Sequence, residues 1–203
     1  MRGRFIVFEG IDGSGKSTTL AAVAAALRKE GHEVVEAREE TTTEAGQWVK
    51  RAVAEKWDAL ATSFLFMADR ARHVIEIEKD LDAGKTVLCD RFLHSTLAYQ
   101  SVTLEGRLPN PVAFLRHLHD GWCLQPDRVL LFRADPTRCL ERIRKRGQAT
   151  PYEKIEFLGR VQEAYAALGR AEPQRFHTID AERDLVAVAA DATQIVRGWV
   201  GPR

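Results

Sequence analysis

The chain has 203 residues, of which 45% are hydrophobic and 29% charged, which excludes a disordered or fibrous protein and allows one well-buried core. Its 30 Lys and Arg residues balance 29 Asp and Glu residues, so we expect no nucleic-acid partner. Apolar runs stay below the roughly 18 residues of a membrane span, and the first residues lack a signal-peptide pattern. These features predict a cytoplasmic protein with a single domain over residues 1–203 and no membrane partner.

Short runs rich in β-branched residues alternate with longer runs of helical spacing. Strands are predicted at 4–9, 32–37, 85–90, 127–133 and 174–180. Helices are predicted at 16–30, 44–56, 59–83, 94–105, 110–121, 136–147, 152–170 and 184–199. This alternation predicts an α/β fold with a parallel sheet of five strands and helices on both faces, a three-layer sandwich. The charged segment 142–154, which contains Gly and Pro but few apolar anchors, is the candidate for a short mobile lid.

The first strand leads into a glycine-rich loop and then a helix. Residues 10–17 match the pattern GxxxxGK[ST] in that context, which is typical of the phosphate cradle of P-loop NTPases. Backbone N–H groups of such a loop converge on nucleotide phosphates, Lys16 reaches the β and γ oxygens, and Ser17 is placed to bind Mg²⁺. The predicted nucleotide-binding residues are Gly10, Ile11, Asp12, Gly13, Ser14, Gly15, Lys16, Ser17 and Thr18.

Two further segments suggest a second substrate beside the phosphate cradle. Asp90 and Arg91 end the third predicted strand, where they face the same crevice, Asp90 toward Mg²⁺ and Arg91 toward a phosphate. Phe66 and Arg70 lie four residues apart on one helix face, where the ring could stack on a base and the guanidinium bond its edge. Alternatively, Asp90 and Arg91 form an ordinary ion pair and Phe66 occupies a core position.

The segments FEGIDGSGKSTT, FLFMADRARH and DRFLHSTLAYQS occur in this order, and together the chain resembles the thymidylate kinase (dTMP kinase) family of nucleoside monophosphate kinases. The resemblance runs from the first strand to the last helix. It implies Mg²⁺-dependent transfer of a phosphoryl group from ATP to dTMP, in nucleotide biosynthesis, by a P-loop fold that is commonly a homodimer.

The resemblance also implies roles for individual residues. Asp12 matches a carboxylate near the sugar 3′-hydroxyl and the acceptor phosphate, Arg91 and Arg38 match phosphate ligands, and Lys16 is shared with all P-loops. Phe66 matches the ring that stacks on thymine, and Arg70 matches the arginine at the thymine edge. The same pocket is expected to contain Ser95, Thr96, Tyr99 and Gln100.

The lid is expected to supply the catalytic cation, because Gly13 and Ser14 leave the P-loop without a basic residue of that kind. Arg142 resembles an arginine that packs on adenine, which leaves Arg146 as the expected transition-state cation. The chain departs from the family where Arg38 to Thr43 read REETTT in place of REPGGT. That change predicts a different backbone path and puts two acids, Glu39 and Glu40, near the phosphate site.

Two other functions remain open from the residues alone. One is another nucleoside or deoxynucleoside monophosphate kinase, and the other is a P-loop ATP-binding regulatory protein with weak or no kinase activity. A GTP switch is disfavoured, because the chain has no Asn/Thr-Lys-x-Asp segment to read guanine. The widely spaced Cys89, Cys123 and Cys139 predict reduced thiols in or near the core.

Overall fold

The computed structural model describes residues 2–144 and 152–201, with the side chains of 152–154 excepted. Its sheet has five parallel strands in the order β2-β3-β1-β4-β5. The strands are β1 (Phe5–Gly10), β2 (Val34–Arg38), β3 (Thr86–Asp90), β4 (Arg128–Arg133) and β5 (Phe176–Asp180). Each lies within a residue or two of a predicted strand, so the predicted α/β fold is confirmed.

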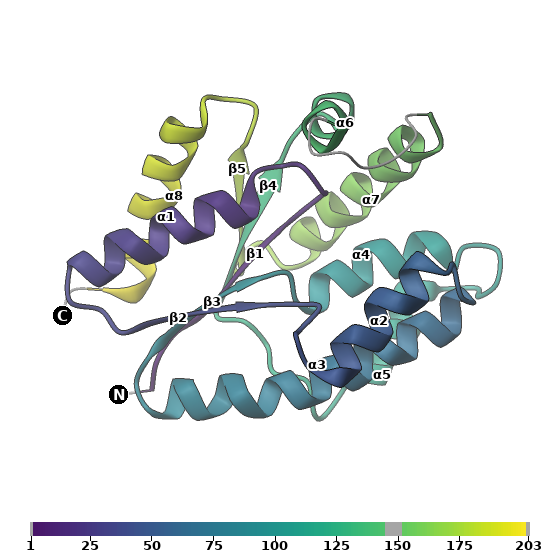
Figure 1. Ribbon diagram of the computed structural model, residues 1–203, viewed down its shortest axis with the longest axis horizontal. Coiled ribbons are helices and arrows are strands. Elements are labelled where there is room, and N and C mark those ends of the chain that lie inside the picture. The colour runs from purple at the N-terminus through teal and green to yellow at the C-terminus, as the bar shows by residue number, and fades with distance from the viewer. Residues whose placement is uncertain (1, 145–151, 202–203) are drawn as a thin grey trace.

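Helices cover both faces of this sheet (Figure 1). They are α1 (Lys16–Lys29), α2 (Glu44–Ala54), α3 (Ala59–Asp82), α4 (Leu93–Thr103), α5 (Pro111–His119), α6 (Pro136–Arg144), α7 (Tyr152–Ala171) and α8 (Leu185–Val200). Helices α1 and α8 pack together on one face, while α3, α4 and α7 lie on the other (Figure 1). None of the helices in the described ranges is long and apolar enough to cross a bilayer.

The central strands form the core because both of their faces are covered. Every residue of β1 and β3 is buried, as expected for parallel strands with helices on each side. The ring of Phe5 meets that of Phe92 edge to face, with centroids 5.0 Å apart. Cys89 and Cys139 are buried free thiols and Cys123 is half-buried, which agrees with the expected core or near-core positions.

Side-chain caps fix where several helices begin. The Asp135 carboxylate accepts hydrogen bonds from the backbone N–H groups of Thr137 (2.8 Å) and Arg138 (3.1 Å), and thereby caps α6 ahead of Pro136. Asn110 caps α5 through the N–H of Ala113, and α5 ends at His119, slightly before the predicted end. The predicted helix 136–147 is described as far as Arg144.

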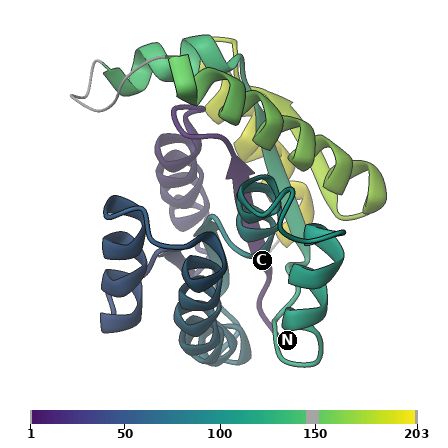
Figure 2. The same cartoon turned by 90° about the vertical axis from the view of Figure 1, so that its right-hand side faces the viewer.

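The strand order creates a crevice at the carboxyl ends of β1 and β3. The chain leaves β1 toward α1 on one face and leaves the adjacent β3 toward α4 on the other, so the two connections separate there. Figure 2 shows α2 and α3 (blue) on one side of this end of the sheet and α6 and α7 (green) above it. Ligands of open α/β sheets bind at such a point.

Candidate active site

The loop between β1 and α1 is folded by its glycines. Gly13 and Gly15 have φ values of 81° and 91°, a region that side chains rarely adopt. A Cβ atom on Gly13 would also lie 2.4 Å from the carbonyl oxygen of Cys139 in α6, so a larger residue cannot fit. The loop therefore packs tightly against α6, and its backbone leads directly into the amino end of α1, as the motif predicts.

Lys16 is buried beneath this loop. Its ammonium group donates a hydrogen bond to the carbonyl oxygen of Ile11 at 3.1 Å. Burial lowers the pKa of Lys16, the charge of Arg91 lowers it further, and the nearby carboxylates of Asp90 and Asp12 only partly compensate, which leaves it at about 8. A phosphate anion in the loop would favour the charged form of Lys16.

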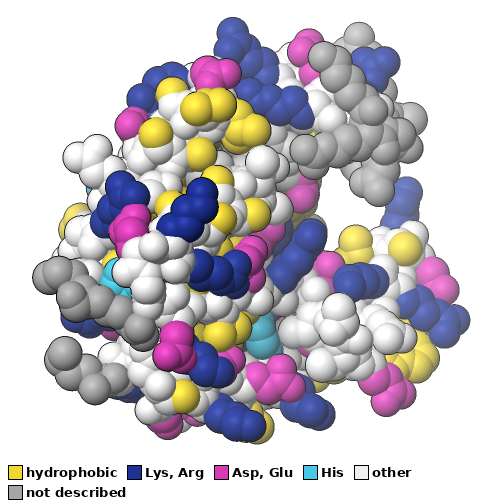
Figure 3. Space-filling model, turned by 60° about the vertical axis from the view of Figure 1, so that its left-hand side comes forward, with side chains coloured by type: hydrophobic (Ala, Val, Ile, Leu, Met, Phe, Trp, Pro, Cys, Tyr) yellow, Lys and Arg dark blue, Asp and Glu magenta, His cyan; other side chains and the backbone are white. Residues whose placement is uncertain are grey.

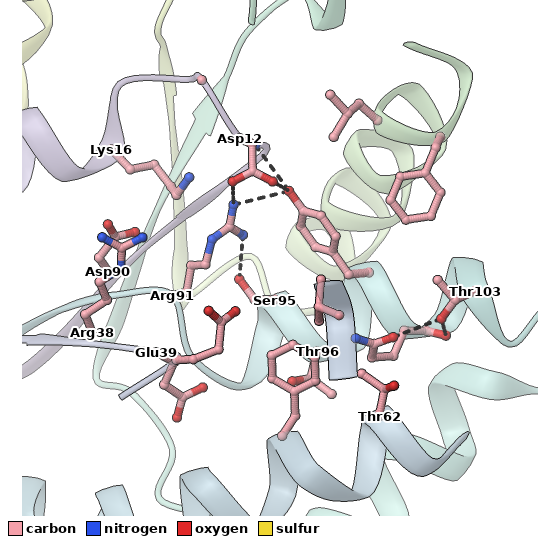
Figure 4. Close-up of a pocket in the computed structure, with 18 of the residues that line it drawn as sticks. Asp12, Lys16, Arg38, Glu39, Thr62, Asp90, Arg91, Ser95, Thr96 and Thr103 are labelled. Atoms are coloured by element: carbon pink, nitrogen blue, oxygen red, sulfur yellow. Dashed lines mark hydrogen bonds and ion pairs between the residues drawn. The ribbon is translucent and has the colours of Figure 1, made fainter. Parts of the chain in front are cut away.

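Ser17 and Asp90 connect the loop to the end of β3. The Ser17 hydroxyl donates a hydrogen bond to Oδ2 of Asp90, while the buried Oδ1 of Asp90 has no hydrogen-bond partner among the described residues. Arg38 is paired with Asp90 in the sheet register and lies beside it in Figure 4. Hydroxyl and carboxylate oxygens are the ligands that Mg²⁺ prefers, so these two side chains fit such an ion.

Arg91 joins the phosphate loop to α4. Its guanidinium donates to Oδ1 of Asp12 at 2.8 Å, to the Tyr99 hydroxyl at 3.2 Å and to the Ser95 hydroxyl at 3.1 Å (Figure 4). Its φ of 70° lies in the left-handed region, which costs energy for a residue with a side chain. The two predicted acceptor-side residues Asp12 and Arg91 are therefore in direct contact.

The charge of Asp12 is stabilised by this arrangement. Partial burial raises the pKa of its carboxyl, but the charges of Arg91 and Lys16 and the Tyr99 and Arg91 hydrogen bonds outweigh it and lower the pKa to about 2. Asp12 is thus ionised at neutral pH, and 59% of its side chain remains accessible.

Two residues that the sequence analysis missed support Arg91, Glu9 through Ser95 and Tyr165 directly. The fully buried carboxylate of Glu9, in β1, accepts hydrogen bonds from the backbone N–H of Phe92 and Ser95, from the Ser95 hydroxyl and from the Tyr165 hydroxyl of α7. It thereby caps α4, which has no side-chain cap of its own. The Tyr165 hydroxyl also accepts a hydrogen bond from Arg91 at 3.4 Å.

Arg70 lies deeper than the sequence suggested. It is only 1% exposed, and its guanidinium pairs along one edge with the Glu39 carboxylate. It also donates to the Thr96 hydroxyl at 2.9 Å and to Nε2 of His119 at 2.9 Å. Glu39, expected near the phosphate site, instead neutralises this buried cation, while Glu40 lines the cavity.

The residue before Arg70 anchors the altered segment that follows β2. The buried Asp69 carboxylate accepts hydrogen bonds from the backbone N–H of Thr41 at 2.9 Å and from the hydroxyl groups of Thr41 and Thr43. Thr43 in turn caps α2 through the N–H of Gly46. The Thr41 hydroxyl thus helps to fix the backbone at a position where the family pattern has glycine.

These groups surround one cavity of about 870 Å³. Its walls include residues of the phosphate loop, of α3 and of α4, among them Lys16, Phe66 and Gln100. The predicted residues that line it are Asp12, Gly13, Gly15, Lys16, Ser17, Thr18, Arg38, Phe66, Arg70, Asp90, Arg91, Ser95, Thr96, Tyr99 and Gln100. Figure 3 shows the surface hollowed between two lobes, with Lys and Arg side chains along the hollow.

The predicted lid is described in part. Arg142 in α6 donates a hydrogen bond to the carbonyl oxygen of Gly13 at 3.2 Å, which places it beside the phosphate loop. Arg146, the expected transition-state cation, lies outside the described residues. Within the described residues, no three His, Cys, Asp or Glu side chains are grouped to hold a metal ion by themselves.

A parallel sheet, a P-loop and a second group of arginine and aromatic side chains in one cavity define a P-loop phosphotransferase with two substrates. Comparison with known proteins gives the family. The thymidylate kinase family model matches residues 8–192, so the chain belongs to the thymidylate kinase family, whose members are nucleoside monophosphate kinases.

Relatives that share this family cover almost the whole chain. A "Probable thymidylate kinase" of Methanosarcina acetivorans is 44% identical over 183 residues, 89% of each chain. A "Probable thymidylate kinase" of Methanococcoides burtonii is 39% identical over 97% of each chain. A "Thymidylate kinase" of Ruegeria pomeroyi is 40% identical over 96% of this chain and 94% of its own.

Proposed function

We propose that the protein transfers the γ-phosphoryl group of ATP to dTMP, giving ADP and dTDP, as one domain over residues 1–203. The observation that carries the proposal is the contact of Arg91 with Asp12 in one cavity, which is lined by the phosphate loop, the proposed donor half, and by Phe66 and Gln100, the proposed acceptor half. Family membership supplies the choice of ATP and dTMP.

The donor half is proposed to bind ATP through residues 10–18. The loop amides and Lys16 would hold the β and γ phosphates, and Arg142, next to Gly13, would pack on the adenine ring. Ser17 and Asp90 would hold Mg²⁺ through the Ser17 hydroxyl and through Oδ1 of Asp90, which has no hydrogen-bond partner among the described residues. The ion would neutralise charge on the phosphates when bound.

The acceptor half is proposed to bind dTMP. The half-buried ring of Phe66 would stack on thymine, with Arg70, Thr96 and Gln100 at the base edge. Tyr99 would lie beneath the sugar, where its hydroxyl already bonds to Asp12.

The acceptor phosphate is proposed to bind between two arginines. Arg91 and Arg38 would contact it, and the Arg38 guanidinium makes no hydrogen bond or ion pair with the other described residues. Ser95 would act on the same phosphate through Arg91, to which its hydroxyl is bonded.

In the reaction, an ionised oxygen of the dTMP phosphate attacks the γ-phosphorus in line with the leaving ADP oxygen. No general base is required, because that phosphate is already ionised at neutral pH. The protein supplies position and positive charge, from Lys16 and Arg91 within the described residues and from Arg146 in the lid. Asp12 would orient Arg91 and the sugar of dTMP.

A coupled assay of ADP release tests the proposal. With dTMP, dUMP, dCMP, dGMP and dAMP as acceptors, we expect turnover to be greatest with dTMP, and Lys16→Ala to abolish it. Arg91→Ala should raise the KM for dTMP by tenfold or more, since a charge-assisted contact is worth about 1.5–3 kcal/mol, while leaving ATP binding nearly intact. Turnover confined to a purine acceptor, or ATP binding with no acceptor-dependent ADP release, would overturn the proposal.

We further propose that two copies pair through α3. Phe64 and Ile75 are 48% and 65% exposed, and with Ala68 and Ala71 they form an exposed apolar stripe at helical spacing. A second α3 would cover this stripe. Ile75→Glu should convert the dimer to a monomer in sedimentation velocity, whereas a monomeric wild type would refute the pairing.

A further inference from the structure

His119 is the last residue of α5, and it is buried against the arginine that faces the cavity. Only 3% of it is exposed, and its ring stacks on that of Trp122 with centroids 5.2 Å apart. Its polar partners are Arg70 in α3 and the carbonyl oxygen of Leu115 in its own helix.

These two partners determine which ring nitrogen carries the proton. Nδ1 lies 2.6 Å from the Leu115 carbonyl oxygen, which can only accept, so Nδ1 must be protonated. Nε2 lies 2.9 Å from Nη1 of Arg70, which can only donate, so Nε2 must carry the lone pair. His119 is therefore held as the neutral Nδ1–H tautomer.

The surrounding charges support the same protonation state. Burial lowers the pKa of His119 to about 4, and the charge of Arg70 adds to this effect. The Leu115 hydrogen bond and the carboxylates of Glu39 and Asp120 act in the opposite direction and are outweighed. The ring is thus neutral at neutral pH.

Most hydrogen-bond donors of Arg70 are already paired within the protein. A guanidinium has five N–H groups. Nε and Nη2 use theirs on Glu39 and Thr96, and one N–H of Nη1 is used on His119. One N–H on Nη1 has no partner among the described residues, and Arg70 lines the cavity.

We infer that His119 is a positioning residue, which fixes the guanidinium of Arg70 so that one N–H remains for a pyrimidine carbonyl. This inference rests on the proposed function. Thymine and uracil present a carbonyl oxygen at C4, whereas cytosine presents an amino group there. A single fixed donor therefore favours dTMP and dUMP over dCMP, because a donor facing an amino group is left unpaired.

Kinetics of three variants test the inference. His119→Leu removes the acceptor, and we expect the KM for dTMP to rise about tenfold, equivalent to about 1.4 kcal/mol, with kcat and the KM for ATP nearly unchanged. The preference for dTMP over dCMP should fall in parallel. His119→Gln, whose side-chain oxygen can accept from Nη1, should restore most of the dTMP affinity. His117→Leu, in the same helix with a side chain 85% exposed, is the matched control and should behave as wild type.

A spectroscopic measurement keeps the test independent of the folding of a variant. The ¹⁵N shifts of the His119 ring in the wild-type protein should show a neutral Nδ1–H tautomer at neutral pH, and an Nε2–H tautomer or an imidazolium would overturn the inference. Equal loss of dTMP and ATP affinity in His119→Leu, or no loss, would also overturn it while leaving the proposed function intact. Absence of wild-type turnover with any pyrimidine monophosphate would overturn the proposed function, and the inference with it.

Discussion

Replacing Tyr165 with phenylalanine removes one hydroxyl from the group that holds Arg91. The residue is 1% exposed, and its hydroxyl lies 2.8 Å from Oε2 of Glu9 and 2.8 Å from the Ser95 hydroxyl. A hydrogen bond to a charged group contributes about 1.5–3 kcal/mol. Glu9 keeps its three other donors in the variant, so we expect a loss of about 2 kcal/mol in the free energy of unfolding.

Scanning calorimetry measures this loss. For a chain of this length, about 2 kcal/mol corresponds to a decrease in Tm of about 4–8 °C. Tyr99→Phe is the matched control, because it removes a hydroxyl that also bonds to Arg91 but on the side of the accessible Asp12. Tyr99→Phe should change Tm little. Equal Tm values for Tyr165→Phe and wild type would refute the assignment of Tyr165 as a buried anchor of Arg91.

Three further predictions concern the phosphate loop and the buried ion pair. The pKa of Lys16 is about 8, so deprotonation should remove its charge, and kcat/KM for ATP should fall, as the pH rises through about 8. Initial rates measured against pH test this expectation, and a flat profile to about pH 10 would contradict it. Glu39→Ala leaves Arg70 buried without its counter-charge and should cost about 3–5 kcal/mol in urea denaturation, so a loss below about 1 kcal/mol would contradict the pairing. Gly13→Ala places a Cβ atom 2.4 Å from the Cys139 carbonyl oxygen and should abolish the stabilisation by ATP in a thermal-shift assay, whereas wild-type stabilisation would refute the tight packing.

The elements and the phosphate loop could be predicted because their signals are local. An apolar run of five or six residues such as β1 indicates a buried strand. The glycine pattern indicates a phosphate loop, whose positive φ values favour glycine. The contact between Asp12 and Arg91 could also be predicted, because the ends of parallel strands meet at one edge.

The supporting contacts could not be predicted in this way because they join distant segments. Glu9 and Tyr165 are 156 residues apart, and Tyr165 occupies an apolar stripe of α7 where any large hydrophobic residue would satisfy the pattern. A polar residue inside the apolar run of β1 was the one available signal for Glu9. The burial of Arg70 depends on Glu39 and His119, which lie in other segments of the chain. Helical spacing with Phe66 therefore indicated the helix face of Arg70 but not its partners.

The contacts of Asp69 with Thr41 and Thr43 bear on how such sequences diverge. Asp69, Thr41 and Thr43 share these hydrogen bonds, so a substitution at one of them leaves a donor or acceptor of the others without its partner. Chains of this family with threonine at 41 should retain a short acceptor at 69, whereas those with glycine at 41 lack one of the two hydroxyl donors to that residue. Covariation of these positions in an alignment would mark the loop as an exchangeable unit, in which different local sequences give the same placement of Glu39 against Arg70.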